Sequence, residues 1–271
     1  MIVALFAICA VMSALMTTAW IVQRRTLNGG WVDVFWSFGT GICCAFAIPL
    51  ASQDGALWRR ALIAAVTVAW SFRLGGYIAW RVARGSEDPR YAALRRQWGA
   101  DYDRRLLRFV LIQAPVSAVL AMAVLYAARQ PDPAFGISDG VGLVIAFAAI
   151  VGEAMADRQM RRFKSNPANR GKVCDQGLWG WSRHPNYVFE AVLWLAFPII
   201  GSNLSDGWSL LSWLAPLLMG AILRYVSGVP PLEAAMLLSK GEAYRLYQQR
   251  VPAMLPTRYA RSRYRHPPAL R

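Results

Sequence analysis

Histidine is nearly missing from this sequence, which has only His184 and His266 among 271 residues. A metal site built from several histidines is therefore excluded. No CxxC or Cys–His spacing occurs either, so we expect neither a zinc site nor a disulfide framework. The cysteines are Cys9, Cys43, Cys44 and Cys174.

Acidic residues are scarce as well. Asp and Glu number 15 against 30 Lys and Arg, which gives a formal net charge of +15. In a soluble protein this balance would indicate nucleic-acid binding. Charged residues, however, make up only 17% of the chain and hydrophobic residues 56%. Basic loops beside membrane spans explain the charge better, so we expect membrane lipid and no nucleic acid as a partner.

Glycine-rich nucleotide loops are missing too. The sequence contains no GxGxxG after a strand, no P-loop and no GxSxG turn. A Rossmann domain is therefore excluded, and any nucleotide must be held by helices and loops.

Seven apolar runs occupy most of the chain instead. They cover roughly residues 2–22, 31–50, 57–80, 107–128, 141–156, 187–201 and 208–226. With allowance for tilt, each is near the ~20 residues that cross a bilayer. We predict an all-α integral membrane protein, a seven-transmembrane helix bundle. A single domain is expected over residues 1–257 and a basic cytoplasmic tail over residues 258–271.

Lys and Arg are distributed unevenly among the segments that join the runs. Of the 30, 26 follow the first, third, fifth or seventh run, and only Arg59, Arg60 and Arg129 lie in the opposite loops. The positive-inside rule then places the N-terminus outside and the C-terminus in the cytoplasm. We expect a location in the bacterial inner membrane, with the active site facing the cytoplasm.

Several polar and ionisable side chains stand inside the runs, where charge is costly and commonly functional. They are Asp33 in the second run, Arg73 and Tyr77 in the third, Glu153 and Asp157 in the fifth, and Asn186 and Glu190 in the sixth. For any one charge alone, an interfacial group or an ion pair such as Arg73 with Asp33 is the simpler reading. Together they predict a polar cavity that opens to the cytoplasm.

The most distinctive string covers residues 177–190, GLWGWSRHPNYVFE. Arg183 and His184 supply donors, and Pro185 favours a helix start whose free N–H groups suit an anion. Six basic residues lie just upstream: Arg158, Arg161, Arg162, Lys164, Arg170 and Lys172. A positive-inside loop with a helix cap would explain the charges. It would not explain why His, Asn, Tyr and Glu gather at one helix start.

This string resembles the C-terminal signature of the steroid 5-alpha-reductase family. The resemblance extends, in the family's order, to Arg73 and Tyr77, to residues 85–91 and to residues 154–159. It implies a seven-helix fold that holds NADPH in a cavity open to the cytoplasm. The implied cofactor contacts are Arg73, Tyr77, Glu153, Asp157, Arg161, Lys164, Lys172, Asn186 and Glu190. As further cofactor-binding candidates we add Arg183, His184, Tyr187 and Glu233.

The resemblance also implies a reaction. The family reduces a carbon–carbon double bond conjugated to a ketone, typically in a 3-oxo-4-ene steroid, while an acidic group polarises the carbonyl oxygen. A carboxylic acid in apolar surroundings can stay protonated and donate there. Asp33 is the candidate acid, in the run where the family keeps a glutamate. With Trp70, at a position where the steroid enzymes carry tyrosine, and Tyr77, it forms the predicted catalytic set.

Two other functions remain open at this point. Membrane methyltransferases share a similar Arg-His-Pro-x-Tyr string and bind S-adenosylmethionine, but that cofactor lacks the phosphates that the basic stretch suits. A non-enzymatic lipid carrier would need no inward-facing polar set.

The loop at residues 87–91 is interpreted either as a lid or as an amphipathic linker on the membrane surface. The oligomeric state stays open, a monomer included.

Overall fold

The computed structural model describes residues 1–85, 87–203 and 206–255. Within these residues the regular structure is helical, apart from one isolated bridge between Asn203 and Asp206. The α-helices are α1 (Ile2–Thr26), α2 (Gly30–Ala51), α3 (Leu57–Arg84), α4 (Pro89–Trp98), α5 (Tyr102–Arg129), α6 (Ile137–Ser165), α7 (Leu178–Trp181), α8 (Pro185–Gly201), α9 (Leu214–Ala221), α10 (Val229–Lys240) and α11 (Glu242–Arg250). Short turns of 3-10 helix are η1 (Gly99–Asp101), η2 (Pro167–Asn169) and η3 (Gly207–Trp213), and η4 (Ile222–Val226) is a π-helix. The predicted all-α class is confirmed for this part of the chain.

Six helical segments are long and apolar enough to cross a membrane. They are Ile2–Thr26, Gly30–Ala51, Leu57–Arg84, Pro89–Arg129, Ile137–Ser165 and Gly207–Lys240. The sixth predicted run corresponds to α8, which is apolar but has only 17 residues. Large apolar side chains such as Phe6, Phe46 and Phe147 stay exposed on these helices, as expected where lipid is the solvent. The chain is therefore described as a helical integral membrane protein.

The chain forms two compact units, which are described separately. The first comprises Met1–Phe147 and Val192–Leu218, and the second comprises Ala148–Ala191 and the chain from Met219 on. The boundary falls inside α6, α8 and α9, so each of these helices contributes to both units. The prediction from sequence was a single domain over residues 1–257.

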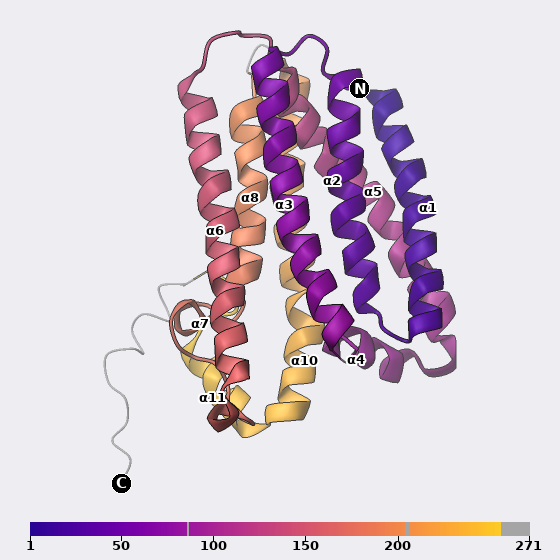
Figure 1. Cartoon of the computed structure of the whole chain (residues 1–271), viewed down its shortest axis with the longest axis vertical. Helices are drawn as coiled ribbons and strands as arrows, with labels where there is room; N and C mark the ends of the chain where they lie inside the picture. Colours follow the sequence, from indigo (N-terminus) through magenta and orange to yellow (C-terminus); the bar gives the residue numbers. More distant parts are fainter. Residues whose placement is uncertain (86, 204–205, 256–271) are drawn as a thin grey trace. The chain divides into compact units, whose positions relative to one another are not determined.

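In the first unit, α1, α2, α3 and α5 pack side by side (Figure 1). Close approach of α2 and α3 depends on Gly41, because a Cβ atom there would lie 2.2 Å from the Cβ atom of Ser71. Trp70 is buried between two other indoles, Trp36 and Trp194, with edge-to-face ring contacts at 6.0 and 5.1 Å. Aromatic packing and small residues thus hold this unit together.

In the second unit, the C-terminal helices form a core of their own. Tyr244, Tyr247 and Val251 are buried there, with Val173 and Met236 packed against them. The phenol of Tyr247 donates a hydrogen bond of 2.6 Å to the carbonyl of Trp179 in α7. This contact fixes α11 against the turn that precedes α8.

The helices extend beyond several of the predicted runs. The fifth run was expected to end at residue 156, but α6 continues to Ser165, because the basic stretch contains good helix formers and meets proline only at Pro167. The seventh run is divided among η3, α9 and η4 and is followed by α10 and α11, which were not predicted. The expected tail at residues 258–271 lies outside the described residues.

Candidate functional site

The predicted site residues are divided between the two units. Asp33, Trp70, Arg73 and Tyr77 belong to the first. The second contains Glu153, Asp157, Arg161, Lys164, Lys172, Arg183, His184, Asn186, Tyr187, Glu190 and Glu233.

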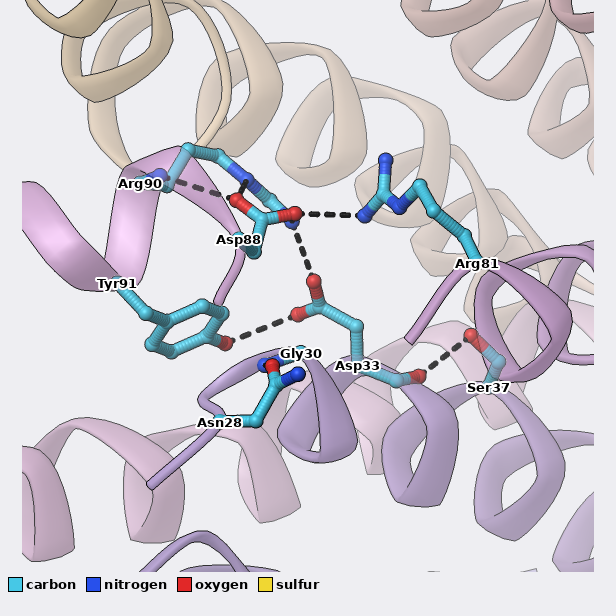
Figure 2. Close-up of polar contacts among 8 residues, drawn as sticks. All are labelled: Asn28, Gly30, Asp33, Ser37, Arg81, Asp88, Arg90 and Tyr91. Atoms are coloured by element: carbon cyan, nitrogen blue, oxygen red, sulfur yellow. Dashed lines mark hydrogen bonds and ion pairs between the residues drawn. The ribbon is translucent and has the colours of Figure 1, made fainter. Parts of the chain in front are cut away.

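Asp33 is the centre of a polar group in the first unit (Figure 2). One carboxylate oxygen accepts a hydrogen bond from the Tyr91 hydroxyl at 2.9 Å, and the other pairs with the guanidinium of Arg90. Arg90 also donates from Nε to Asp88 at 3.0 Å, and Arg81 donates to Asp88 at 2.6 Å. Arg90 thus bridges two carboxylates, one from α2 and one from the start of α4.

Local sequence explains why this group forms. Asp88 is the N-cap of α4, since its side chain accepts from the backbone N–H of Arg90 at 3.0 Å, and Pro89 occupies the first helical position. Tyr91 then packs against Gly29, where a Cβ atom would lie 2.2 Å from the tyrosine ring. Residues 87–91, interpreted from sequence as a lid or a linker, are therefore anchored to the start of α2.

Electrostatics stabilise the charged form of Asp88. Burial would raise the pKa of this carboxyl, but Arg90 and Arg81 outweigh that effect and hold the pKa well below its usual range. The contacts of Asp33 resemble those of a carboxylate, because it accepts hydrogen bonds from two neighbours. They do not match the neutral acid expected from sequence, and the ion pair is with Arg90 rather than the suggested Arg73.

Trp70, Arg73 and Tyr77 follow one another along α3. The guanidinium of Arg73 lies 5.9 Å from the ring centroid of Tyr77, as the i, i+4 spacing predicts. Tyr77 also stacks on Trp80, with ring centroids 6.3 Å apart. Trp70 is buried among indoles, so its role in this unit is packing, and its predicted catalytic role stays a prediction.

Acidic side chains are buried inside helices of the second unit. Glu153 is 4% exposed, Asp157 5% and Glu190 5%. Such burial requires compensation by hydrogen bonds or opposite charge, and in a membrane helix it marks a functional candidate. Arg161, Lys164 and Lys172, predicted to contact phosphate, are exposed at the end of α6 and after it. Along α6, the buried acids Glu153 and Asp157 are therefore followed by the exposed cations Arg161 and Lys164.

Arg183, His184 and Glu233 meet at the turn before α8. Arg183 donates from Nε to Glu233 at 2.7 Å, and His184 Nε2 lies 3.0 Å from the same carboxylate oxygen. Gln248 of α11 donates to the other oxygen at 2.6 Å. Burial lowers the pKa of His184, against the opposing effect of Glu233, so the ring is neutral near pH 7 and donates its Nε2 proton to Glu233.

The segment Val251–Ala253, here called the C-terminal strap, completes this arrangement. The backbone N–H groups of Arg183 and His184 donate to the carbonyls of Pro252 and Ala253 at 2.9 and 3.1 Å. Arg183 Nη1 donates to the carbonyl of Val251 as well. The strap and Glu233 therefore hold the start of α8, where Asn186 and Tyr187 lie, and the Tyr187 ring stacks on His184 at 5.3 Å.

Sequence reasoning missed the partners in both groups. Arg81, Asp88 and Arg90 were not predicted, although Asp88-Pro89 is a recognisable helix start. The C-terminal strap was missed because backbone carbonyls leave no signal in a sequence, and Gln248 because its partner Glu233 lies on another helix. In both cases the partners lie far along the chain from the residue that they hold.

Comparison with known proteins gives a family but no activity. A family model described as "Protein of unknown function (DUF1295)" matches residues 19–251. The chain is similar to "Uncharacterized protein C594.04c" of Schizosaccharomyces pombe, with 27% identity over 271 residues, which covers 88% of this chain and 75% of that protein. No solved structure matches the chain.

Proposed function

The chain belongs to the family described as "Protein of unknown function (DUF1295)", and we propose that it is an NADPH-dependent reductase embedded in a membrane. Its substrate is a 3-oxo-4-ene steroid or a similar membrane-soluble enone, reduced at the C4–C5 double bond. The proposal extends the resemblance of residues 177–190 to the steroid 5-alpha-reductase family.

The proposed topology has seven spans, with α8 as the short sixth one. The N-terminus lies outside and the tail in the cytoplasm of a bacterial cell, so the basic stretch at the end of α6 and after it faces the cytoplasm, where NADPH is made available. A helix of 17 residues is at the lower limit of what crosses a bilayer. The distribution of Lys and Arg supports this orientation.

The observation that carries the proposal is the set of buried acids in the second unit. Glu153, Asp157 and Glu190 are suited to accept hydrogen bonds from the ribose hydroxyls and amide of a nicotinamide dinucleotide. The exposed Arg161, Lys164 and Lys172 supply cations for its phosphates. The residues present therefore fit the cofactor that the resemblance implies.

The reaction needs a hydrogen-bond donor at the substrate oxygen, where negative charge develops. Bound NADPH supplies the hydride that goes to the β-carbon of the enone. Because Asp33 accepts from Arg90 and Tyr91, we assign the donor to the hydroxyl of Tyr77. Asp33 then acts as a positioning residue for the start of α2, so Asp33→Asn should keep cofactor and lower turnover.

The test is to purify the full chain in detergent and measure bound nicotinamide by its absorbance at about 340 nm. NADPH binding should fall at least about tenfold in Arg73→Ala and Asn186→Ala, the loss expected for a charge-assisted contact. Arg84→Ala is the matched control, because it removes an exposed arginine from the same helix. Oxidation of NADPH should depend on an added 3-oxo-4-ene steroid. Unchanged binding in both variants would refute the assignment.

A methyltransferase that uses S-adenosylmethionine is the second candidate. The contact of Glu233 with Arg183 and His184 favours it, because those enzymes share the Arg-His-Pro-x-Tyr string with a downstream Glu. S-adenosylmethionine has no phosphates, so the cations at the end of α6 and after it would then have no ligand. Co-purification of S-adenosylmethionine in place of reduced nicotinamide would decide for the methyltransferase.

A further inference from the structure

The first helix ends in two adjacent arginines beside a hollow on the first unit. The hollow has a volume of about 370 Å³ and is lined by Ile21, Arg24 and Arg25. Positions 21, 24 and 25 share one face of α1 because they are three and four residues apart.

Arg24 is held in a fixed orientation at this hollow. Its Nε pairs with Asp103 of α5 at 3.0 Å, and its guanidinium lies 4.8 Å from the ring centroid of Trp20. The indole of Trp20 in turn donates to the backbone carbonyl of Asp103 at 2.9 Å. Because the ion pair uses Nε and the side chain is 51% exposed, the terminal amino groups remain available to a ligand.

Arg25 has no such partner. Its side chain is exposed and makes no ion pair or side-chain hydrogen bond with the described part of the chain. One oriented guanidinium and one uncommitted guanidinium therefore border the same hollow. Guanidinium groups recognise phosphate oxygens through paired N–H donors, so a phosphate suits this pair.

The third residue that lines the hollow, Ile21, is apolar and belongs to a helix with other exposed apolar side chains. Ile21 is 39% exposed, and Val11, Phe6 and Val3 are exposed further along the same membrane-crossing helix. An indole with its N–H bonded, such as Trp20, is typical of the level of the lipid headgroups. The ligand that matches is one with a phosphate at the arginines and a hydrocarbon chain beside α1.

We propose that the hollow at the end of α1 binds an anionic phospholipid, with its phosphate between Arg24 and Arg25 and an acyl chain against Ile21. A general attraction of basic residues to the membrane surface would act on every exposed arginine at this end. Binding at a specific site would instead depend on Arg24 and Arg25.

The experiment is native mass spectrometry of the full chain in detergent with dioleoylphosphatidylglycerol or dioleoylphosphatidylcholine added. The wild type should retain the anionic lipid in preference. One cation near a lipid surface changes affinity about fivefold, so Arg25→Gln should weaken retention about fivefold and Arg24→Gln/Arg25→Gln about 25-fold. Arg25→Gln removes no side-chain hydrogen bond or ion pair within the described chain, so its effect reports on the lipid rather than on folding.

The matched control is Arg104→Gln/Arg105→Gln, which removes the same charge from two exposed arginines that pair with Asp101 at the start of α5. Retention in this control should change by about twofold or less. Equal losses in the two pairs, or no preference for the anionic lipid, would overturn the proposal. Displacement of the lipid by glycerol 3-phosphate alone would also overturn it, because the site would then bind a soluble phosphate.

Discussion

Asp88 connects the residues of Figure 2, because Arg81 and Arg90 both pair with it and it caps α4. Asp88→Asn leaves two arginines without their carboxylate and weakens the cap. We expect a loss of about 2–4 kcal/mol in the free energy of unfolding, measured by thermal or denaturant unfolding in detergent. Asp101→Asn, at an exposed carboxylate, is the control and should change it by less than about 1 kcal/mol.

The same carboxyl predicts a dependence on acid. The pKa of Asp88 is lower in the folded protein than the 3.8 of an unperturbed aspartate, so the unfolded chain takes up the proton first as the pH falls. The stabilisation is complete above about pH 5 and is lost progressively below the unfolded pKa. Unfolding free energies measured from pH 6 to pH 3 should therefore fall less in Asp88→Asn than in the wild type.

His184 is a base rather than an acid, but its contribution to stability is also lost as the pH falls. Burial lowers the pKa of His184 below the usual 6.5, so the unfolded chain binds a proton that the folded chain does not. Its contribution is complete above the unfolded pKa and is lost as the pH falls from about 7 to 5. His184→Gln should flatten the stability profile in this interval. An unchanged slope would show that another group titrates there.

At the scale of elements, the side chain of Arg59 holds the segment between α5 and α6. Arg59 of α3 is buried, pairs with Asp139 of α6 at 2.7 Å and donates to the carbonyls of Gln130, Asp132 and Ala134. Three backbone carbonyls between α5 and α6 are therefore satisfied by one side chain from α3.

Removing the Arg59 side chain should lower the free energy of unfolding. Arg59→Met leaves Asp139 buried without its partner, and we expect a loss of about 3–5 kcal/mol in the free energy of unfolding in detergent. Arg60→Met, at the next residue, is the control and should lose less than about 1 kcal/mol. Arg59→Met/Asp139→Leu should recover part of the loss, because no unpaired carboxylate remains. No recovery would mean that the carbonyl contacts dominate.

Elements were predicted well where their signal is local. Apolar runs identified the cores of α1, α2, α3, α5, α6 and α8, because burial in lipid requires long apolar stretches. The short helices α4, α10 and α11 were missed. They are stabilised by contacts with distant segments, such as that of Tyr247 with Trp179, rather than by a long apolar pattern.

At the scale of the whole molecule, sidedness can be tested by labelling. In a variant without the four native cysteines, a cysteine at Gln53 should react with a membrane-impermeant maleimide from outside. A cysteine at Asn166 should react only after the membrane is opened. Both positions are exposed in the described chain. The reverse pattern would invert the proposed orientation.

The short helix α8 decides the number of spans. If it crosses the membrane, a cysteine at Asp206, just beyond its end, should be labelled from outside like one at Gln53. If a cysteine at Asp206 is labelled only after the membrane is opened, as at Asn166, then α8 turns back without crossing. The chain then has fewer than seven spans. Labelling at the three positions therefore distinguishes seven spans from the alternatives.

The sequence by itself determined that this is a helical membrane protein and where most of its apolar helices lie. Those properties depend on the length and composition of the apolar runs, which are local along the chain. It also placed Arg73 and Tyr77 on one face of α3, since helical spacing is a local property.

Only the tertiary structure decided the partners of the polar residues. Asp33 accepts from Arg90 and Tyr91, more than fifty residues away, and Arg183 reaches the carbonyls of the C-terminal strap. Which cation meets which carboxylate depends on how the helices pack and on where a glycine allows close approach. The spacing of residues along a single helix contains no information about either.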